Sequence, residues 1–218
     1  MKKLVVLLSI FFSFNVVYCA DFVAGVVGRF GASSATTDKG KIFNTDFRDF
    51  DVSVSFQPGV FWGHNDLLST AFLFDIGFND DKYEIRHNID GKRVLENFNF
   101  KSLSVGLFPR LNVGFISIGL GGGIKLPLNL KYSREGNKHS YDFGDIRDSF
   151  KTIYIPYVKA SADFLIKNNK RMITLGVYAN YDFPMDIDKN GLLKDVSITK
   201  GSLASFDIGF QIGMYFIN

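Results

Sequence analysis

The sequence predicts an all-β protein, an eight-stranded antiparallel up-and-down transmembrane β-barrel. Apolar and polar residues alternate with a period of two over eight segments, as expected for strands with one apolar and one polar face. Long and short connections between these segments also alternate, which is typical of a barrel whose long loops lie at one rim. After residue 20, no stretch reaches the roughly 18 uninterrupted apolar residues of a membrane helix.

The N-terminus has the pattern of an export signal. Two lysines follow Met1, the run from Leu4 to Val17 is almost wholly apolar, and Ala20 offers a small residue for cleavage. As a helix this run would be only ~21 Å long, short of the roughly 30 Å that spans a bilayer. We therefore expect a signal peptide that is cleaved after Ala20. Acylation of Cys19 is the alternative, because the residues before it weakly resemble a lipobox.

Composition excludes two common ways of stabilising or using an exported domain. Cys19 is the only cysteine, so no intramolecular disulfide can form. Without Lys2 and Lys3, 23 basic residues face 22 acidic ones, which argues against a nucleic-acid partner held by bulk charge. The 24 phenylalanines and 9 tyrosines suit strands with aromatic surfaces.

The eight alternating segments are the expected barrel strands, and the connections set their topology. The strands are expected at 21–31, 50–62, 67–80, 97–109, 113–132, 152–166, 171–183 and 202–217. Long polar connections are expected at 32–49, 81–96, 133–151 and 184–201, and short ones at 63–66, 110–112 and 167–170. The domain organisation is then a signal peptide at 1–20 and one barrel at 21–218, with four long extracellular loops at one end.

The third and fourth segments are predicted to form a hairpin about Asp90-Gly91, a dipeptide typical of a two-residue turn. In that register the numbers of paired residues sum to 181, which places their apolar residues on one face. Beyond Phe78 and Leu103 the apolar residues change sides without a register slip. We therefore expect the hairpin to leave the lipid there and to pack its inner side against other loops.

The fifth segment, "FISIGLGGGIKLPLNLKY" at 115–132, has an apolar residue at nearly every even position from Ile116 to Tyr132. Three glycines and Lys125 lie among the odd positions. We expect the glycines, Gly119, Gly121 and Gly123, to make room for a large ring such as Phe115, Tyr178 or Tyr215. A phosphate-binding loop is disfavoured, because no helix follows.

The polar faces predict a filled interior. Eight strands enclose a space just wide enough for side chains, so inward charges should form a hydrogen-bonded network. The residues expected in this interior polar network are Asp75, Lys125, Lys159, Asp163, Asp182 and Asp207, together with Arg29.

In these features the chain resembles the small eight-stranded outer-membrane barrels, the superfamily of the outer membrane protein A transmembrane domain and the opacity-type surface proteins. The resemblance covers the whole mature chain. It implies a location in the bacterial outer membrane, and outer-membrane lipid and the barrel assembly machinery as partners. Gln211, Gly213 and Phe216 match the family's C-terminal assembly signal, whereas Asn218 stands where an aromatic residue is usual.

The resulting functional hypothesis is a non-enzymatic surface barrel with a structural, adhesion or host-interaction role, an extracellular ligand of unknown identity, and no cofactor or metal. A narrow, low-conductance channel is one alternative. A lipid-modifying enzyme is another, with candidates His87 or His139, Ser140 or Ser149, and Asp142 or Asp145, although their placement in loops disfavours catalysis. The stretch "DIDKNG" at 186–191 begins like a calcium loop but lacks its closing glutamate.

Overall fold

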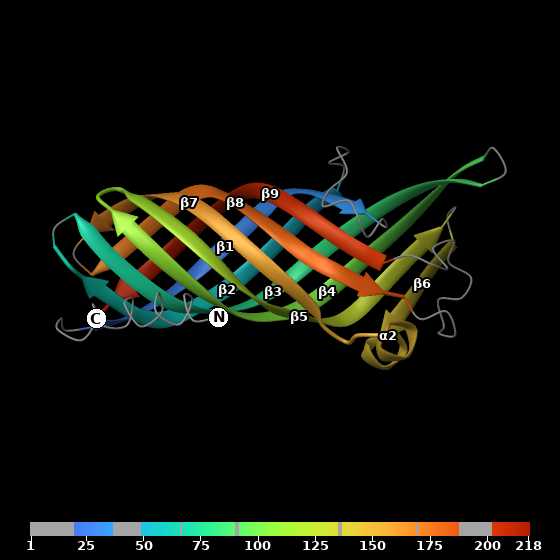
Figure 1. The fold of residues 1–218 in the computed structure, drawn as a ribbon, viewed down its shortest axis with the longest axis horizontal. Coiled ribbons are helices and arrows are strands. Elements are labelled where there is room, and N and C mark those ends of the chain that lie inside the picture. The colour runs from blue at the N-terminus through green and yellow to red at the C-terminus, as the bar shows by residue number, and fades with distance from the viewer. Residues whose placement is uncertain are drawn as a thin grey trace, which may run out of the picture.

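The chain forms a closed antiparallel β-barrel (Figure 1). The computed structural model describes residues 20–36, 49–65, 67–89, 92–134, 137–168, 170–187 and 202–218. The elements are β1 (Asp21–Thr36), β2 (Asp49–Gly63), β3 (Leu68–Ile89), β4 (Lys92–Val113), β5 (Ile116–Arg134), β6 (Asn137–Asp142), α2 (Phe143–Ser149), β7 (Ile155–Asn168), β8 (Arg171–Asp186) and β9 (Ser202–Ile217). The signal peptide predicted at 1–20 lies outside the described residues, except for Ala20.

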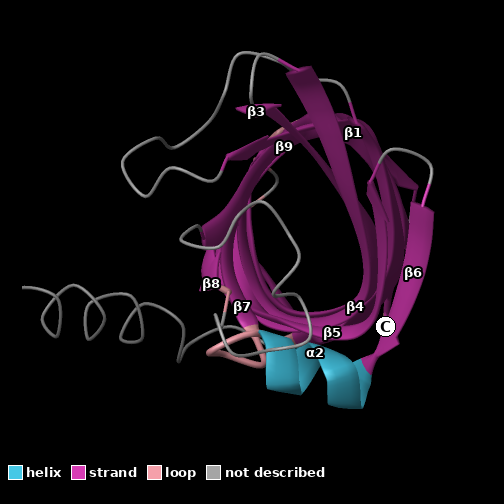
Figure 2. Cartoon of the chain, turned by 90° about the vertical axis from the view of Figure 1, so that its right-hand side faces the viewer, coloured by secondary structure: helices cyan, strands magenta, loops and turns pink. Residues whose placement is uncertain are grey.

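Eight of these strands make the barrel, which confirms the predicted fold class. Strands β1 to β5 and β7 to β9 pair antiparallel with their neighbours, β5 pairs β7, and β1 closes the ring against β9. The view along the barrel shows this ring, with β6 and α2 at its side (Figure 2). β6 pairs with β5 beyond the ring.

The two ends of the barrel differ, as the alternating connections predict. Only residues 114–115 separate β4 from β5, and Gly114 adopts the left-handed conformation that this tight turn requires (φ 59°). The β3–β4 hairpin, β6 and α2 lie together at the opposite end (Figure 1). The short turn expected at 110–112 is wrong by a few residues, because β4 continues to Val113.

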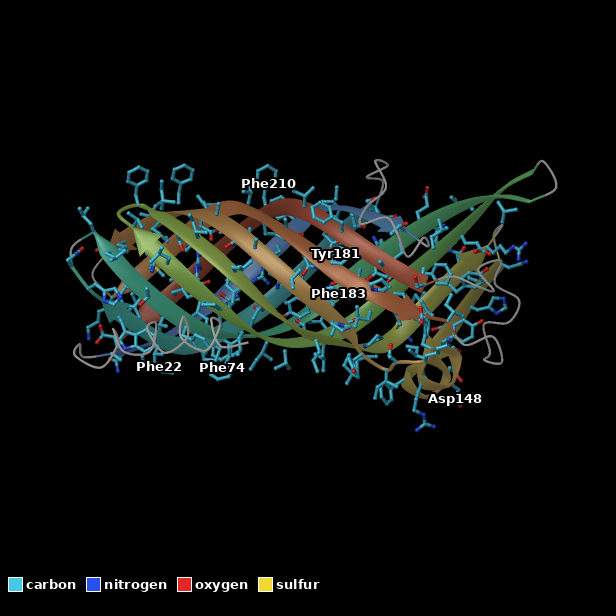
Figure 3. All side chains as sticks on the ribbon, viewed as in Figure 1. Phe22, Phe74, Asp148, Tyr181, Phe183 and Phe210 are labelled. Atoms are coloured by element: carbon cyan, nitrogen blue, oxygen red, sulfur yellow. The ribbon has the colours of Figure 1, made fainter. Side chains whose placement is uncertain are left out.

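The exterior of the barrel is apolar. Phe22, Phe74 and Phe210 project away from the wall (Figure 3), and each is about half exposed. From Leu103 to Val113 the exposed side chains cover roughly 34 Å of strand, or about 26 Å along the axis at a tilt of ~40°. The apolar band of outer-membrane barrels is about 25 Å tall. Exposed apolar side chains come from every barrel strand and include Val26, Phe56, Ile76, Leu107, Ile118, Val158, Leu175 and Ile212.

Beyond this apolar belt, the end carrying the β3–β4 hairpin, β6 and α2 forms an extension with its own apolar core. The predicted hairpin register is observed, with all pairs from Leu68↔Val113 to Ile89↔Lys92 summing to 181. Tyr83, Ile85 and Phe98 become inward and buried there, as the change of sides predicts. The full core comprises Tyr83, Ile85, Phe98, Phe100, Leu130, Tyr132, Ile146, Phe150, Ile155, Met185, Ile187 and Leu203.

Two β-bulges deliver further apolar residues into this core. The β4–β5 register shifts between Lys101 and Ser102, and the β8–β9 register shifts between Asp182 and Met185. An extra residue in one strand moves all later side chains to the other face. Leu130 is therefore fully buried although Leu128, two residues earlier, is exposed. The even-numbered side chains at 115–132 therefore do not all point to the same face: they point outward before the bulge and inward after it.

The short helix α2 was not expected, since the sequence shows no helical period. Its seven residues complete fewer than two full turns, too few for a period to be visible. It starts with a capping box in which Asp142 accepts from the Asp145 amide at 3.1 Å and Asp145 accepts from the Asp142 amide at 3.2 Å. Ile146 anchors it in the extension core.

No helix within the described part of the chain is long and apolar enough to cross a membrane.

A closed sheet pairs its backbone groups along the whole ring, and here its outer surface is apolar over the thickness of a hydrocarbon core. The barrel is therefore that of an outer-membrane protein, with the extension on the side of the long loops.

Candidate functional site

The lumen is filled by polar side chains that connect opposite walls. In its inner layer, nearer the short turns, Asp75 accepts a hydrogen bond from Lys159 Nζ at 2.7 Å and one from Gln57 Nε2 at 2.8 Å. Arg29 lies 3.5 Å from the same carboxylate and donates to Ser55 Oγ at 2.9 Å. One carboxylate on β3 thereby joins cations from β1 and β7.

A second carboxylate, Asp163, completes the inner layer. Arg110 lies 2.5 Å from Asp163 and donates to Tyr215 Oη at 2.7 Å. Tyr215 donates in turn to Gln57 Oε1 at 2.5 Å, and Gln211 Nε2 donates to Asp163 Oδ1 at 2.6 Å. These three ion pairs are therefore parts of one network across the barrel, in which both carboxylates and all three cations have partners.

The outer layer of the lumen, just below the extension core, is dominated by carboxylates. Lys125 Nζ lies 3.0 Å from Asp81 and 2.8 Å from Asp182. Asn180 Nδ2 donates to Asp182 at 2.9 Å and to Asp207 at 2.8 Å. Asp51 accepts from the backbone amide of residue 82 at 2.7 Å.

The structure places all six residues of the predicted interior network in the lumen, and Arg29 with them. Each is at most 5% exposed. Sequence reasoning missed Arg110 and Asp81, because it assigned them to a turn and to a loop, respectively. Asp51 lies in the strand expected at 50–62, but it was not among the residues expected in the network. One signal could have found Arg110. It lies three positions before Val113, so on the same strand the two side chains point to opposite faces, and an outward Val113 implies an inward Arg110.

Large rings fill the rest of the lumen near the short turns. A Cβ on Gly119 or Gly121 would lie 2.5 Å from the ring of Phe108, so these glycines do make room for an aromatic side chain. The ring is not one of the three expected, and Phe115 is 64% exposed rather than inside. Tyr215 instead lies over Gly25 and beside Gly213.

The three residues of the predicted assembly signal divide between the two faces of β9. Gln211 points into the lumen, Phe216 is 52% exposed on the apolar belt, and Gly213 leaves space beside Tyr215. Recognition by an assembly machinery stays a prediction.

The candidate catalytic residues have structural roles or lie apart. Asp142 and Asp145 cap α2, and Ser149 Oγ donates to the Asp145 carbonyl at 2.6 Å. The ring centroids of His139 and Tyr141 are 6.4 Å apart. Among the described residues, His139 makes no hydrogen bond to Ser140 or Ser149. The side chain of His87, and residues 188–191 of the stretch resembling a calcium loop, lie outside the described residues.

The outer face of the extension carries a polar groove of about 420 Å³. Strand pairing brings Asn99, Lys131 and Ser140 into one row across β4, β5 and β6. A second row, one pair of residues further along, consists of Asn97, Ser133 and Lys138. Tyr132 and His139 also line the groove, and no carboxylate from the described part of the chain does.

The groove lies on a rigid platform because the inner side of the same sheet is packed. Phe98 and Tyr132 contact each other with ring centroids 5.0 Å apart. The Tyr132 hydroxyl donates to Glu96 Oε1 at 3.0 Å. Burial raises the pKa of Tyr132, and the Glu96 carboxylate raises it further, so the hydroxyl stays protonated and keeps this bond.

No family model matches the sequence, and no curated protein matches it either. Solved structures match at low identity. Neisserial surface protein A from Neisseria is 11% identical over 91% of this chain and 98% of its own, with a TM-score of 0.42. The attachment invasion locus protein Ail of Yersinia pestis, solved with a heparin analogue, is 11% identical over 88% and 99%, with a TM-score of 0.37. The outer membrane protease OmpT of Escherichia coli is 9% identical over 91% and 96%, with a TM-score of 0.38.

At these identities and TM-scores, function has to be argued from this chain's own residues. The closed ring, the apolar belt and the charge-filled lumen are features of the chain itself. The fold is that of the small eight-stranded outer-membrane barrels.

Proposed function

We propose that the chain is a non-enzymatic outer-membrane barrel whose extension binds an anionic polysaccharide outside the cell. The observation that carries this proposal is the groove across β4, β5 and β6, where Lys131 and Lys138 are exposed and none of the described lining residues is a carboxylate. Asparagine and serine side chains between the lysines supply hydrogen-bond donors and acceptors for hydroxyl groups. Function in such barrels is carried by the outer segments on a rigid scaffold.

The lumen favours this role over that of a channel. Arg29, Asp75 and Lys159 connect three strands across the ring, and Arg110, Asp163 and Gln211 do so nearer the short turns. An ion would have to break these buried pairs to pass. We expect no stable single-channel conductance in planar bilayers.

The arrangement of the candidate catalytic residues disfavours an enzyme. A serine nucleophile needs a base within hydrogen-bond reach. Among the described residues, His139 makes no hydrogen bond to Ser140 or Ser149. Purified protein should release no fatty acid from lipopolysaccharide.

Binding of dextran sulfate, with uncharged dextran as the matched polymer, tests the proposal. The folded barrel should bind only the sulfated polymer, and binding should fall steeply with salt. The double variant Lys131→Gln/Lys138→Gln should weaken binding by about tenfold or more. Lys167→Gln/Lys170→Gln, with the same charge change at the opposite rim, should not. Equal binding by both variants would contradict the proposal.

A separate arm distinguishes the source of the anionic groups. The same variants are compared in vesicles with and without lipopolysaccharide, at constant protein. A groove occupied by the phosphates of neighbouring lipopolysaccharide would bind dextran sulfate only in its absence. A groove open to external polysaccharide should bind it in both.

A further inference from the structure

The outer layer of the lumen contains an unbalanced group of acids. Asp51, Asp81 and Asp207 are each at most 4% exposed, and one oxygen from each lies within 4.8 Å of the others. Lys125 pairs with Asp81 and Asp182. Within the described chain, no cation lies within 4.0 Å of Asp51 or Asp207. Four carboxylates thus share one ammonium group, a net charge of −3 when ionised.

Unpaired polar atoms point to a ligand at this place. Asp51 Oδ2 and Asn180 Oδ1 are buried and have no hydrogen-bond partner, although both residues are more than nine-tenths buried. The Asn79 amide nitrogen is unpaired as well. Buried polar groups nearly always have a partner, so each exception needs an explanation. Here the three residues line the same cavity.

That cavity has the size and lining of an ion site. Its free volume of about 20 Å³ holds one ion or one water molecule. Asp51, Asp81, Asp207, Asn79 and Asn180 line it, together with Lys125 and with Arg29 and Lys159, which pair with Asp75. Two oxygens that each lie about 2.4 Å from one ion are up to roughly 4.8 Å apart, which agrees with the observed spacing.

We propose that this cavity binds a divalent cation, Ca²⁺ in preference to Mg²⁺. Carboxylates of Asp51, Asp81 and Asp207, binding through one or both oxygens, and the amide oxygen of Asn180 supply the ligands. Ca²⁺ accepts six to eight oxygens in irregular geometry, whereas Mg²⁺ demands a near-ideal octahedron. The ion would neutralise most of the excess negative charge. It would also connect β2, β3 and β9, which carry Asp51, Asp81 and Asp207, beneath the extension core.

The test uses the full mature chain folded in detergent free of lipopolysaccharide, which itself binds divalent cations. After treatment with EGTA, Ca²⁺ is titrated by calorimetry and the unfolding midpoint is followed by gel migration. We expect one Ca²⁺ per barrel and a rise in the midpoint of about 5 °C at saturation. Mg²⁺ should act more weakly and choline chloride should have no effect.

The variant Asp51→Asn removes one charge and keeps the oxygen that accepts the residue 82 amide. It should fold and should lose at least about tenfold in Ca²⁺ affinity. Asp148→Asn changes an exposed acid on α2 (Figure 3) and should bind Ca²⁺ as the native chain does. No Ca²⁺ binding by the native barrel, or equal binding by Asp51→Asn, would overturn the proposal. Stability that depends on pH but not on Ca²⁺ would also overturn it, because a shared proton would then neutralise the layer.

Discussion

The two layers of the lumen are built from the same kinds of side chain but are balanced differently. In the inner layer, Asp75 and Asp163 face three cations, and amide and hydroxyl groups fill the remaining sites. In the outer layer, four carboxylates face Lys125. Burying charges costs free energy unless each is paired and hydrogen-bonded. The inner layer is therefore complete as folded, whereas the outer layer carries excess negative charge when its carboxylates are ionised.

The largest effect should come from removing the one cation of the outer layer. Lys125→Met leaves Asp81 and Asp182 buried without an ion-pair partner, and breaking a buried pair typically costs about 3–5 kcal/mol. The free energy of unfolding in urea, followed by the fluorescence of Trp62, the only tryptophan, measures this loss. A change below about 1 kcal/mol would mean that the outer layer is already neutral without Lys125.

A smaller loss is expected from the matching change in the inner layer. Arg110→Met removes the partner of Asp163, but Gln211 and Ser161 still donate to that carboxylate. We expect a loss of about 2–3 kcal/mol, less than for Lys125→Met measured in the same way. The reverse order would contradict the proposed difference between the layers.

Two tyrosine hydroxyls allow a finer comparison. Tyr215→Phe breaks the bridge between Arg110 and Gln57, and Tyr83→Phe removes a donor to Asp182. Tyr215→Phe should lower the free energy of unfolding by about 1–2 kcal/mol, because it leaves Gln57 Oε1 buried without a donor. Tyr83→Phe should cost about 0.5–1 kcal/mol, because Lys125 and Ser205 still donate to the same Asp182 oxygen. Adding Ca²⁺ should reduce the loss only for Tyr83→Phe, since it alone lies in the outer layer.

The smallest effect belongs to the groove. Lys131→Gln/Lys138→Gln alters exposed side chains and should change the free energy of unfolding by less than about 0.5 kcal/mol. A larger loss would show that these lysines stabilise the extension, and their effect on polysaccharide binding would need a structural explanation.

Much of the fold could be predicted because its main signals are local. Period-two alternation revealed all eight strands. The dipeptide Asp90-Gly91 predicted a hairpin register that is observed in every pair from Leu68↔Val113 to Ile89↔Lys92. The bulges near Leu128 and Asp182 could not be seen, because the alternation of residues continues while the faces change. A seven-residue helix likewise leaves no period to detect.

The candidate sites could be predicted only in part. Inward charges follow from alternation alone, but the meeting of Asp51, Asp81 and Asp207 depends on how β2, β3 and β9 are staggered around the ring. Such staggering is set by pairings between residues far apart in the sequence. The groove depends on β6, a strand that lies inside a segment expected to be a loop.

The most direct test of the difference between the layers compares Asp75→Asn with Asp51→Asn in EGTA. Asp75→Asn deprives Arg29 and Lys159 of their carboxylate and should destabilise the barrel by about 3 kcal/mol. Asp51→Asn relieves repulsion among like charges and should leave the free energy of unfolding unchanged or raise it. Destabilisation of similar size in both variants would contradict the account.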